Sequence, residues 1–291
     1  MQNSSLVTND MRLLDLGLLL FQVAHWTVQA QSGAPPATPG VRLEVRTRSD
    51  QRTFRIGEII PLELRFSSTI ENKYQLETRN SDRSGRLDTE TYSVEPRSGW
   101  QDPLDLYYRT AVFIGGGLGT MRWLSTESVP ITADLNEWVR FDQPGDYRLT
   151  VKSRRVRDVA MGSDHPAVRS NEVLLNIVAA TPEWQEETLR QSLAVLAKST
   201  PVRPHQAGAP DPARDAIRTL RFLGTAAAAR EMAHCVSDRD CELGLAGTPV
   251  REAALDEMNK LIRDSVIAED DRIRILMSVL ATPNGPGGDR R

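Results

Sequence analysis

Serine, aspartate and histidine stand side by side in the segment Ser163-Asp164-His165. These are the residue types of a hydrolytic triad, in which histidine takes the proton of the attacking serine. The members of a triad normally come from separate elements of the fold, so three sequence neighbours rarely form one. The chain also has no Gly-x-Ser-x-Gly motif, which presents the serine of many hydrolases on a sharp turn. We therefore interpret residues 162–166 as a polar loop and predict no catalytic residue.

Patterns that bind metals or phosphates are also missing from the sequence. The histidines beyond residue 30 are scattered, and no His-Glu-x-x-His motif occurs. The acidic clusters at 238–240 and 269–271 do not fit a calcium loop, and the second suits a helix N-terminus. The glycine-rich segment 115–120 lacks the lysine of a phosphate-binding loop and is expected to be a hairpin tip. We predict no metal site and no cofactor.

The two cysteines allow two kinds of chemistry. Cys235 follows His234, and a cysteine beside a histidine can act as a nucleophile. In an exported chain, however, Cys235 and Cys241 are more simply explained as a disulfide that closes a small loop over residues 236–240. Their spacing is also longer than that of a redox-active Cys-x-x-Cys motif. We favour the disulfide over two free thiols.

One stretch of the chain is rich in aromatic side chains, namely Trp100, Tyr107, Tyr108, Phe113 and Trp123. Aromatic residues on loops at one end of a β-sandwich make a plausible contact surface for a peptide or a glycan. We therefore take Trp100, Tyr107, Tyr108 and Trp123 as a candidate contact surface. The alternative is that half of these side chains simply fill the core of the sandwich.

Composition and charge narrow the function classes further. The chain has 291 residues, 40% of them hydrophobic, which suits two domains with real cores. Its 36 basic and 39 acidic residues give a net charge of −3, which argues against a general polyanion binder. Arginines alternate with acidic residues along residues 42–65 instead of forming one basic face. We therefore predict no nucleic-acid partner.

The first thirty residues have the pattern of a signal peptide. A short apolar stretch at 13–24 leads to Val28-Gln29-Ala30, whose small residues suit cleavage after Ala30. Translation could start at Met1 or at Met11. A buried amphipathic helix is the alternative, but a Pro/Gly-rich linker follows at 31–40. We expect an exported protein, periplasmic or extracellular, with no integral membrane segment in the mature chain.

Residues 41–180 have the periodicity of a β domain. Apolar and polar residues alternate along 41–47 and again along 60–66, as expected for strands with one buried face. Proline cannot donate to a β-ladder, so Pro61 should begin its strand or lie at a sheet edge. Further strands are predicted at seven places that also alternate or are rich in β-formers: 74–79, 86–94, 108–114, 122–125, 137–141, 147–153 and 171–179. Short strands separated by turn residues are typical of an antiparallel sandwich.

A tyrosine supports this interpretation. Tyr147 follows Gly145 by two residues, between two alternating strands. This arrangement resembles the tyrosine corner of Greek-key sandwiches, where the phenol hydroxyl bonds to the backbone a few residues upstream. We expect a structural role for Tyr147 and not a catalytic one.

Residues 181–282 have the pattern of an all-α domain, and 283–291 that of a disordered tail. Thr181, Asp211 and Thr248 each precede a proline, which predicts a capped helix start at each position. Gly224 should end the second helix, and Thr225 should cap a short partner helix. The second and third starts are 37 residues apart (248 − 211), near the period of helical repeats.

Taken together, the chain resembles uncharacterised exported bacterial proteins that pair an immunoglobulin-like sandwich with a small HEAT-like helical region. The segments that carry the resemblance are 54–64, 141–151 and 220–225. It implies an α+β, two-domain fold, with an immunoglobulin-like, Greek-key antiparallel β-sandwich followed by a bundle of helical repeats. It implies export but no reaction, since fold analogy alone does not establish function.

Two functions fit these observations. The first is an exported, non-catalytic binding or scaffolding protein of the bacterial cell envelope, with a protein, peptide or glycan partner. The alternative is a cell-envelope hydrolase, or an accessory module of one, whose acidic residues meet only in the folded chain. An enzyme would need a deep polar cleft where two or three acidic or histidine side chains converge.

Overall fold

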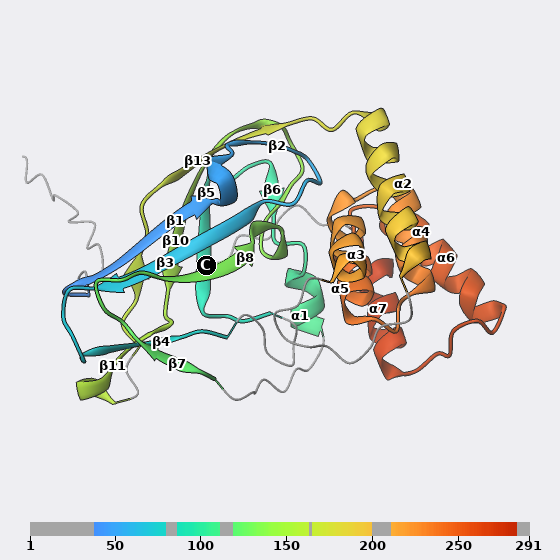
Figure 1. The fold of residues 1–291 in the computed structure, drawn as a ribbon. Helices are drawn as coiled ribbons and strands as arrows, with labels where there is room; N and C mark the ends of the chain where they lie inside the picture. The colour runs from blue at the N-terminus through green and yellow to red at the C-terminus, as the bar shows by residue number, and fades with distance from the viewer. Residues whose placement is uncertain (1–37, 80–85, 111–118, 163–164, 200–210, 284–291) are drawn as a thin grey trace, which may run out of the picture. The chain divides into compact units, whose positions relative to one another are not determined.

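A computed structural model describes residues 38–79, 86–110, 119–162, 165–199 and 211–283. The predicted signal peptide, most of the linker and nearly all of the predicted tail lie outside the described residues. So do Phe113, Ser163, Asp164 and most of the glycine-rich segment. The protein is a mixed α+β structure in which a region of several antiparallel sheets is followed by a helical region (Figure 1). None of the described helices is long and apolar enough to span a membrane.

The first sheet contains the most strongly alternating segments of the sequence. Its order is β1 (Val41–Thr47), β3 (Pro61–Ser68) and β8 (Val129–Asp134). Buried residues alternate with less buried ones along all of β3, so one face of the sheet is dry. The strand begins at Pro61, as predicted, and lies in the middle of the sheet.

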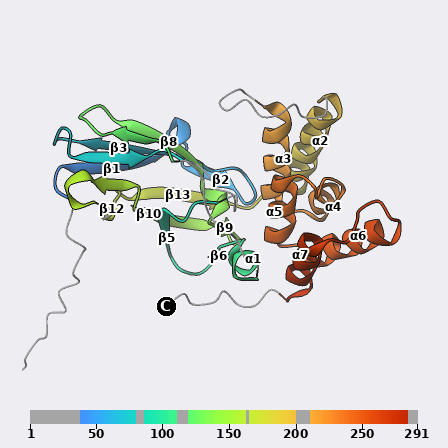
Figure 2. The same ribbon diagram turned by 90° about the horizontal axis from the view of Figure 1, so that it is seen from below.

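The second sheet is built around the long strand β10 (Gly145–Ser153). Its order is β12 (Val168–Arg169), β10, β13 (Val173–Val178) and β2 (Thr53–Arg55), and β5 (Glu90–Glu95) also pairs with β10. All of these pairs are antiparallel except β13 with β2. Figure 2 shows β1, β3 and β8 on one side and β10, β12 and β13 on the other. Their apolar side chains form one core cluster, which includes Phe54, Phe66 and Leu149.

Two smaller sheets complete the β region. One has the order β11 (Val156–Asp158), β4 (Tyr74–Glu77) and β7 (Met121–Trp123), and the other joins β6 (Trp100–Gln101) to β9 (Arg140–Phe141). The strand expected at 137–141 is therefore shorter, because a 3-10 turn occupies Leu135–Glu137 before β9 begins.

The predicted role of Tyr147 is confirmed. Its hydroxyl donates a hydrogen bond of 3.0 Å to the carbonyl oxygen of Gln143, four residues upstream. The phenol ring is buried and packs against Phe141, with the ring centroids 4.6 Å apart. Tyr147 therefore holds the turn that leads into β10.

Most of the predicted helix starts are also confirmed. Thr181 caps α2 (Pro182–Lys198), Asp211 caps α3 (Pro212–Leu223), and Thr225 caps α4 (Ala226–His234). Gly224 follows α3 in the left-handed conformation, with φ of 68°. Asp270 caps α7 (Asp271–Ala281), so the acidic cluster at 269–271 does lie at a helix N-terminus.

The third predicted start is wrong by a few residues. Helix α6 runs from Arg251 to Arg263 and follows Val250, without a side-chain cap. The Thr248 hydroxyl instead accepts a hydrogen bond from the Val250 amide, which makes a tight turn before the helix. A Thr-Pro pair suits such a turn as well as it suits a helix cap.

Two helices were not predicted. Residues 105–110 form α1 (Asp105–Thr110), not the start of a strand at 108–114. Helix α5 (Arg239–Gly247) begins inside the loop that the cysteines close. Its buried residues include Cys241, Leu243 and Leu245, and Asp238 caps it. The glycines at 244 and 247 obscured it, because glycine is unfavourable within helices in general.

The helical region has its own apolar core, and the β part of the chain contributes to it. Leu104 and Tyr107 belong to this second cluster, together with side chains of α3 to α7. Helix α3 packs on α5, and α4 packs on α6. Residues 35–291 form one compact unit, and α1 reaches across the boundary expected near residue 181.

Candidate binding surface

The four aromatic residues predicted as a contact surface are not brought together as one. Tyr107 is buried in the helical core, which removes it from any exposed surface. Trp100 packs against the β core, and its indole nitrogen donates to the carbonyl oxygen of Pro96 at 3.0 Å. Tyr108 is half-buried beneath the guanidinium of Arg86, 4.7 Å from the ring centroid. Trp123 is exposed, with 47% of its surface accessible.

Tyr107 serves as a buried hydrogen-bonding group. Its hydroxyl lies 2.5 Å from Oε1 of Glu242 and accepts a hydrogen bond of 2.9 Å from Nη1 of Arg239. Glu242 is fully buried and also pairs with Arg239 and Arg272. Burial is the main cause that raises the pKa of Tyr107 well above its usual value, and the hydrogen bond to Glu242 is the second cause. The cluster is a closed structural network, because its charges pair with one another.

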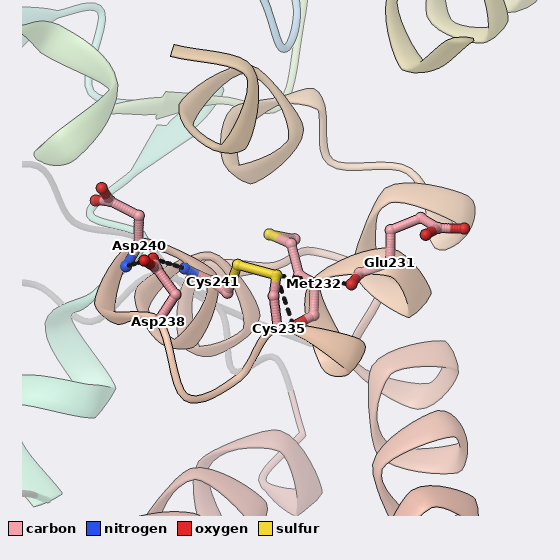
Figure 3. The surroundings of a disulfide bond; sticks show 6 residues. All are labelled: Glu231, Met232, Cys235, Asp238, Asp240 and Cys241. Atoms are coloured by element: carbon pink, nitrogen blue, oxygen red, sulfur yellow. Dashed lines mark hydrogen bonds between the residues drawn. A yellow bond between two sulfur atoms is a disulfide. The ribbon is translucent and has the colours of Figure 1, made fainter. Parts of the chain in front are cut away.

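Cys235 and Cys241 form a disulfide (Figure 3). It joins the residue that follows α4 to the third residue of α5. Asp238 closes the short loop between them, since its Oδ1 accepts hydrogen bonds from the amides of Asp240 and Cys241. His234 lies 3.4 Å from Glu257 on α6, at its Nε2 atom. Cys235 and Cys241 therefore form a structural crosslink, and neither is a free thiol beside the imidazole of His234.

A line of ion pairs connects the β region to the helices. Arg221 on α3 is buried, and its Nη1 atom lies 2.8 Å from Oε1 of Glu137 and 3.2 Å from Oδ1 of Asp240. Arg218 pairs with Asp134 on β8. Burial raises the pKa of Glu137, and the charge of Arg221 opposes that rise. Asp134 and Glu137 of the β region hold the two regions together, because an arginine of α3 pairs with each of them.

The space at this junction is too small for a substrate. A cavity of about 30 Å³ lies between Ile60 and Phe141 of the β region and Phe222 and Leu243 of the helices. That volume suits about one or two water molecules. Glycine permits the close approach here, because a Cβ atom on Gly57 would lie 2.8 Å from the carbonyl oxygen of Leu223. The junction is therefore a packed joint between the two regions.

A much larger opening lies along one edge of the β region. It measures about 500 Å³ and is lined by Thr78, residues 120–122 and residues 129–132. We call it the edge groove. Residues 120–122 belong to or adjoin β7, and residues 129–132 belong to β8. Its lining mixes exposed side chains with the buried residues Val129 and Ile131.

The groove lies along two consecutive strands, β7 and β8, which belong to different sheets. β8 pairs with β3, β7 pairs with β4, and both registers are antiparallel. Figure 1 shows the chain passing from β7 through the bend into β8, with each strand beside its own partner. Among the described strands, β7 and β8 are each the last in their sheet. An edge strand of this kind offers unpaired backbone groups to another chain.

Proline positions show which backbone groups of β8 face outward. In an antiparallel ladder, hydrogen-bonded residue pairs alternate with pairs that are not hydrogen-bonded. Pro61 is opposite Asp134 and Pro130 is opposite Arg65, and proline has no N–H to donate. Neither of these pairs is therefore hydrogen-bonded. The pair of Thr132 with Glu63 lies midway between them and, by the alternation, is not hydrogen-bonded either. Thr132 thus directs its N–H and C=O away from β3.

The β7 side of the groove is partly apolar and carries one cation. Met121 lines the groove and is 40% exposed. Trp123, which is 47% exposed, lies beyond the lining on the same face of the sheet as Met121, because the two alternate with Arg122. Arg122 lines the groove and is exposed, and within the described part of the chain it has no ion-pair partner. By contrast, Glu77 on the neighbouring strand is paired with Arg79.

The remaining predictions about chemistry concern histidine and metals. His165 is exposed, next to residues outside the described part of the chain. Across the described ranges, no group of three or more histidine, cysteine or acidic side chains is arranged to hold a metal ion. No model of a known protein family matches the chain, and no curated protein matches it either.

Proposed function

We propose that this chain is an exported, non-catalytic binding protein of the bacterial cell envelope and that it binds its partner in the edge groove. The groove carries the proposal, because an open volume of about 500 Å³ there meets the exposed side chain of Met121 and the edge of β8, which pairs with no further strand among the described residues. In this proposal the β region is an immunoglobulin-like, Greek-key sandwich, and α3 to α7 are HEAT-like helix pairs.

The joint between the two regions supports a binding role. The ion pairs of Arg221 with Glu137 and of Arg218 with Asp134, together with the close approach of Gly57 to Leu223, connect the β region firmly to the helices. Binding to a preformed site loses less conformational entropy than binding to a mobile one. A stable β region would therefore present the edge groove in one conformation. The leader pattern at residues 1–30 supports export.

Site-specific photo-crosslinking in bacterial cells tests the proposal. A photoreactive phenylalanine analogue would replace Met121 in the groove or, as the control, Leu174 on β13, which is 51% exposed and does not line the groove. We expect the groove position to form a crosslinked product that the control position does not form. Identical products from both positions, or no product from Met121, would overturn the assignment of the groove.

Export is tested separately in the same cells. Fractionation and mass spectrometry of the purified protein should find it outside the cytoplasm, with a new N-terminus after Ala30. A chain that keeps its leader and stays in the cytoplasm would contradict export, whatever the crosslinking shows.

A further inference from the structure

We infer that the occupant of the edge groove is an extended, acidic peptide segment that adds as a strand beside β8. This inference rests on the proposed function, because it names the class of partner for the same groove. It depends on three features of the described residues. They are the outward backbone groups of β8, the exposed apolar side chains of β7, and the charge of Arg122.

The backbone of β8 supplies the main recognition. Thr132 directs both its N–H and its C=O away from β3, and Pro130 directs its C=O the same way, as the proline positions show. An extended peptide can exchange main-chain hydrogen bonds with such an edge, which is how strand addition gains affinity without a fixed sequence. β8 has six residues, about 20 Å at the usual rise per residue. It can therefore pair with a short linear segment.

The opposite wall of the groove contacts the side chains of the peptide. Met121 lines this wall, and its flexible thioether adapts to apolar side chains of different shapes. Trp123, the last residue of β7, lies on the same face of the sheet and offers an aromatic contact beyond Met121. Every second residue of an extended peptide points the same way, so alternate apolar residues would meet this wall.

Charge selects an acidic peptide. Among the described residues that line the groove, Arg122 is the charged one, and the nearby carboxylates of Glu77 and Glu63 are already paired with arginines. An acidic side chain on the peptide can therefore form a charge-assisted hydrogen bond with Arg122 without displacing a partner within the described residues. A basic side chain at the same place would be repelled by the positive charge of Arg122.

Fluorescence anisotropy with synthetic peptides tests this inference on the whole mature protein. The probes are three labelled peptides that alternate valine with glutamate, with threonine or with lysine. We expect the glutamate peptide to bind best and the lysine peptide to bind worst. Arg122→Gln should weaken binding of the glutamate peptide about fivefold, the scale of one exposed ion pair, and should leave the threonine peptide unchanged. Equal binding of all three peptides would overturn the acidic preference.

Strand addition is tested first on the peptide, with the protein unchanged. N-methylation of every second amide, in either of the two possible registers, removes hydrogen-bond donors from only one edge of the strand. The methylation pattern that removes the donors facing β8 should abolish binding, and the pattern that removes the donors facing away from β8 should leave binding intact. On the protein, Thr132→Pro should weaken binding while Thr132→Val, which keeps the N–H, should not. Circular dichroism would establish that both variants fold.

The two proposals fail in different ways. If neither N-methylated register affects binding, or none of the peptides binds, the inference about the partner is wrong. The groove itself is still supported in that case if Met121, and not Leu174, forms the crosslinked product. If the crosslink is also absent, the proposed function falls together with the inference.

Discussion

The hydroxyl of Tyr107 lies 2.5 Å from a carboxylate oxygen of Glu242, although 135 residues separate them in the chain. Tyr107 belongs to α1, an excursion from the β part of the chain, and Glu242 belongs to α5. The contact is buried and Arg239 completes it. The helical core is therefore closed by a residue that the β part of the chain supplies.

Tyr107→Phe removes this hydroxyl and leaves the buried Glu242 with one fewer partner. We expect the free energy of unfolding to fall by about 1–3 kcal/mol, the usual penalty for an unsatisfied buried group. Chemical denaturation would measure it. Tyr92→Phe is the matched control, because the buried Tyr92 hydroxyl has no hydrogen-bond partner within the described structure. Its loss should be neutral or stabilising, and equal losses in both variants would contradict the role of Tyr107.

The disulfide between Cys235 and Cys241 should stabilise the helical region modestly. The cysteines are six positions apart, and closing so short a loop stabilises a protein by about 2 kcal/mol in the chain-entropy model. We expect Cys235→Ser combined with Cys241→Ser to lower the free energy of unfolding by that amount. Two free thiols titrated in the purified, non-reduced wild-type protein would show that the bond does not form.

Glu137 should give the stability a specific pH dependence. In the unfolded chain its carboxyl titrates near its ordinary pKa of 4.5, and burial raises the pKa in the folded protein. Between these two pKa values the folded protein binds more protons than the unfolded chain. The stability contributed by this group is therefore fully present below pH 4.5 and is lost as the pH rises through the folded pKa.

Comparison with Glu137→Gln isolates this effect, because the variant has no titrating group at that position. We expect the unfolding free energy of the wild type minus that of the variant to decrease as the pH rises from 4.5. Urea unfolding over a pH series would measure the difference. A difference that increases with pH would contradict the expected direction of the pKa shift.

Gly57 should be essential to the joint between the two regions. Its φ of 85° already disfavours any other residue, and an added Cβ would lie 2.8 Å from the Leu223 carbonyl oxygen. Gly162 is the control, with φ of 69° but no described residue within 4 Å of an added Cβ. Gly162→Ala should cost about 1–3 kcal/mol from backbone strain alone. We expect Gly57→Ala to cost about 1–3 kcal/mol more, because the packed junction must shift.

Residues 41–47 and 211–225 show how much the sequence determined by itself. The strand β1 has the predicted bounds, and α3 begins after Asp211 and is ended by Gly224 as predicted. Alternation, capping and glycine in a left-handed conformation are local effects, since neighbours in the chain set the energies. The hydrogen bond from Tyr147 to Gln143 was predictable for the same reason.

Tertiary structure alone decided α1, α5 and the edge groove. Residues 105–110 carry aromatic side chains that suit a strand, yet they fold as a helix whose Tyr107 is buried among α3 to α7. The burial of that face depends on residues more than a hundred positions away, which no local pattern encodes. The groove likewise exists because β7 and β8 lie at the ends of their sheets. Sequence periodicity identifies a strand and its buried face, but the order of strands in a sheet is decided by how the whole chain packs.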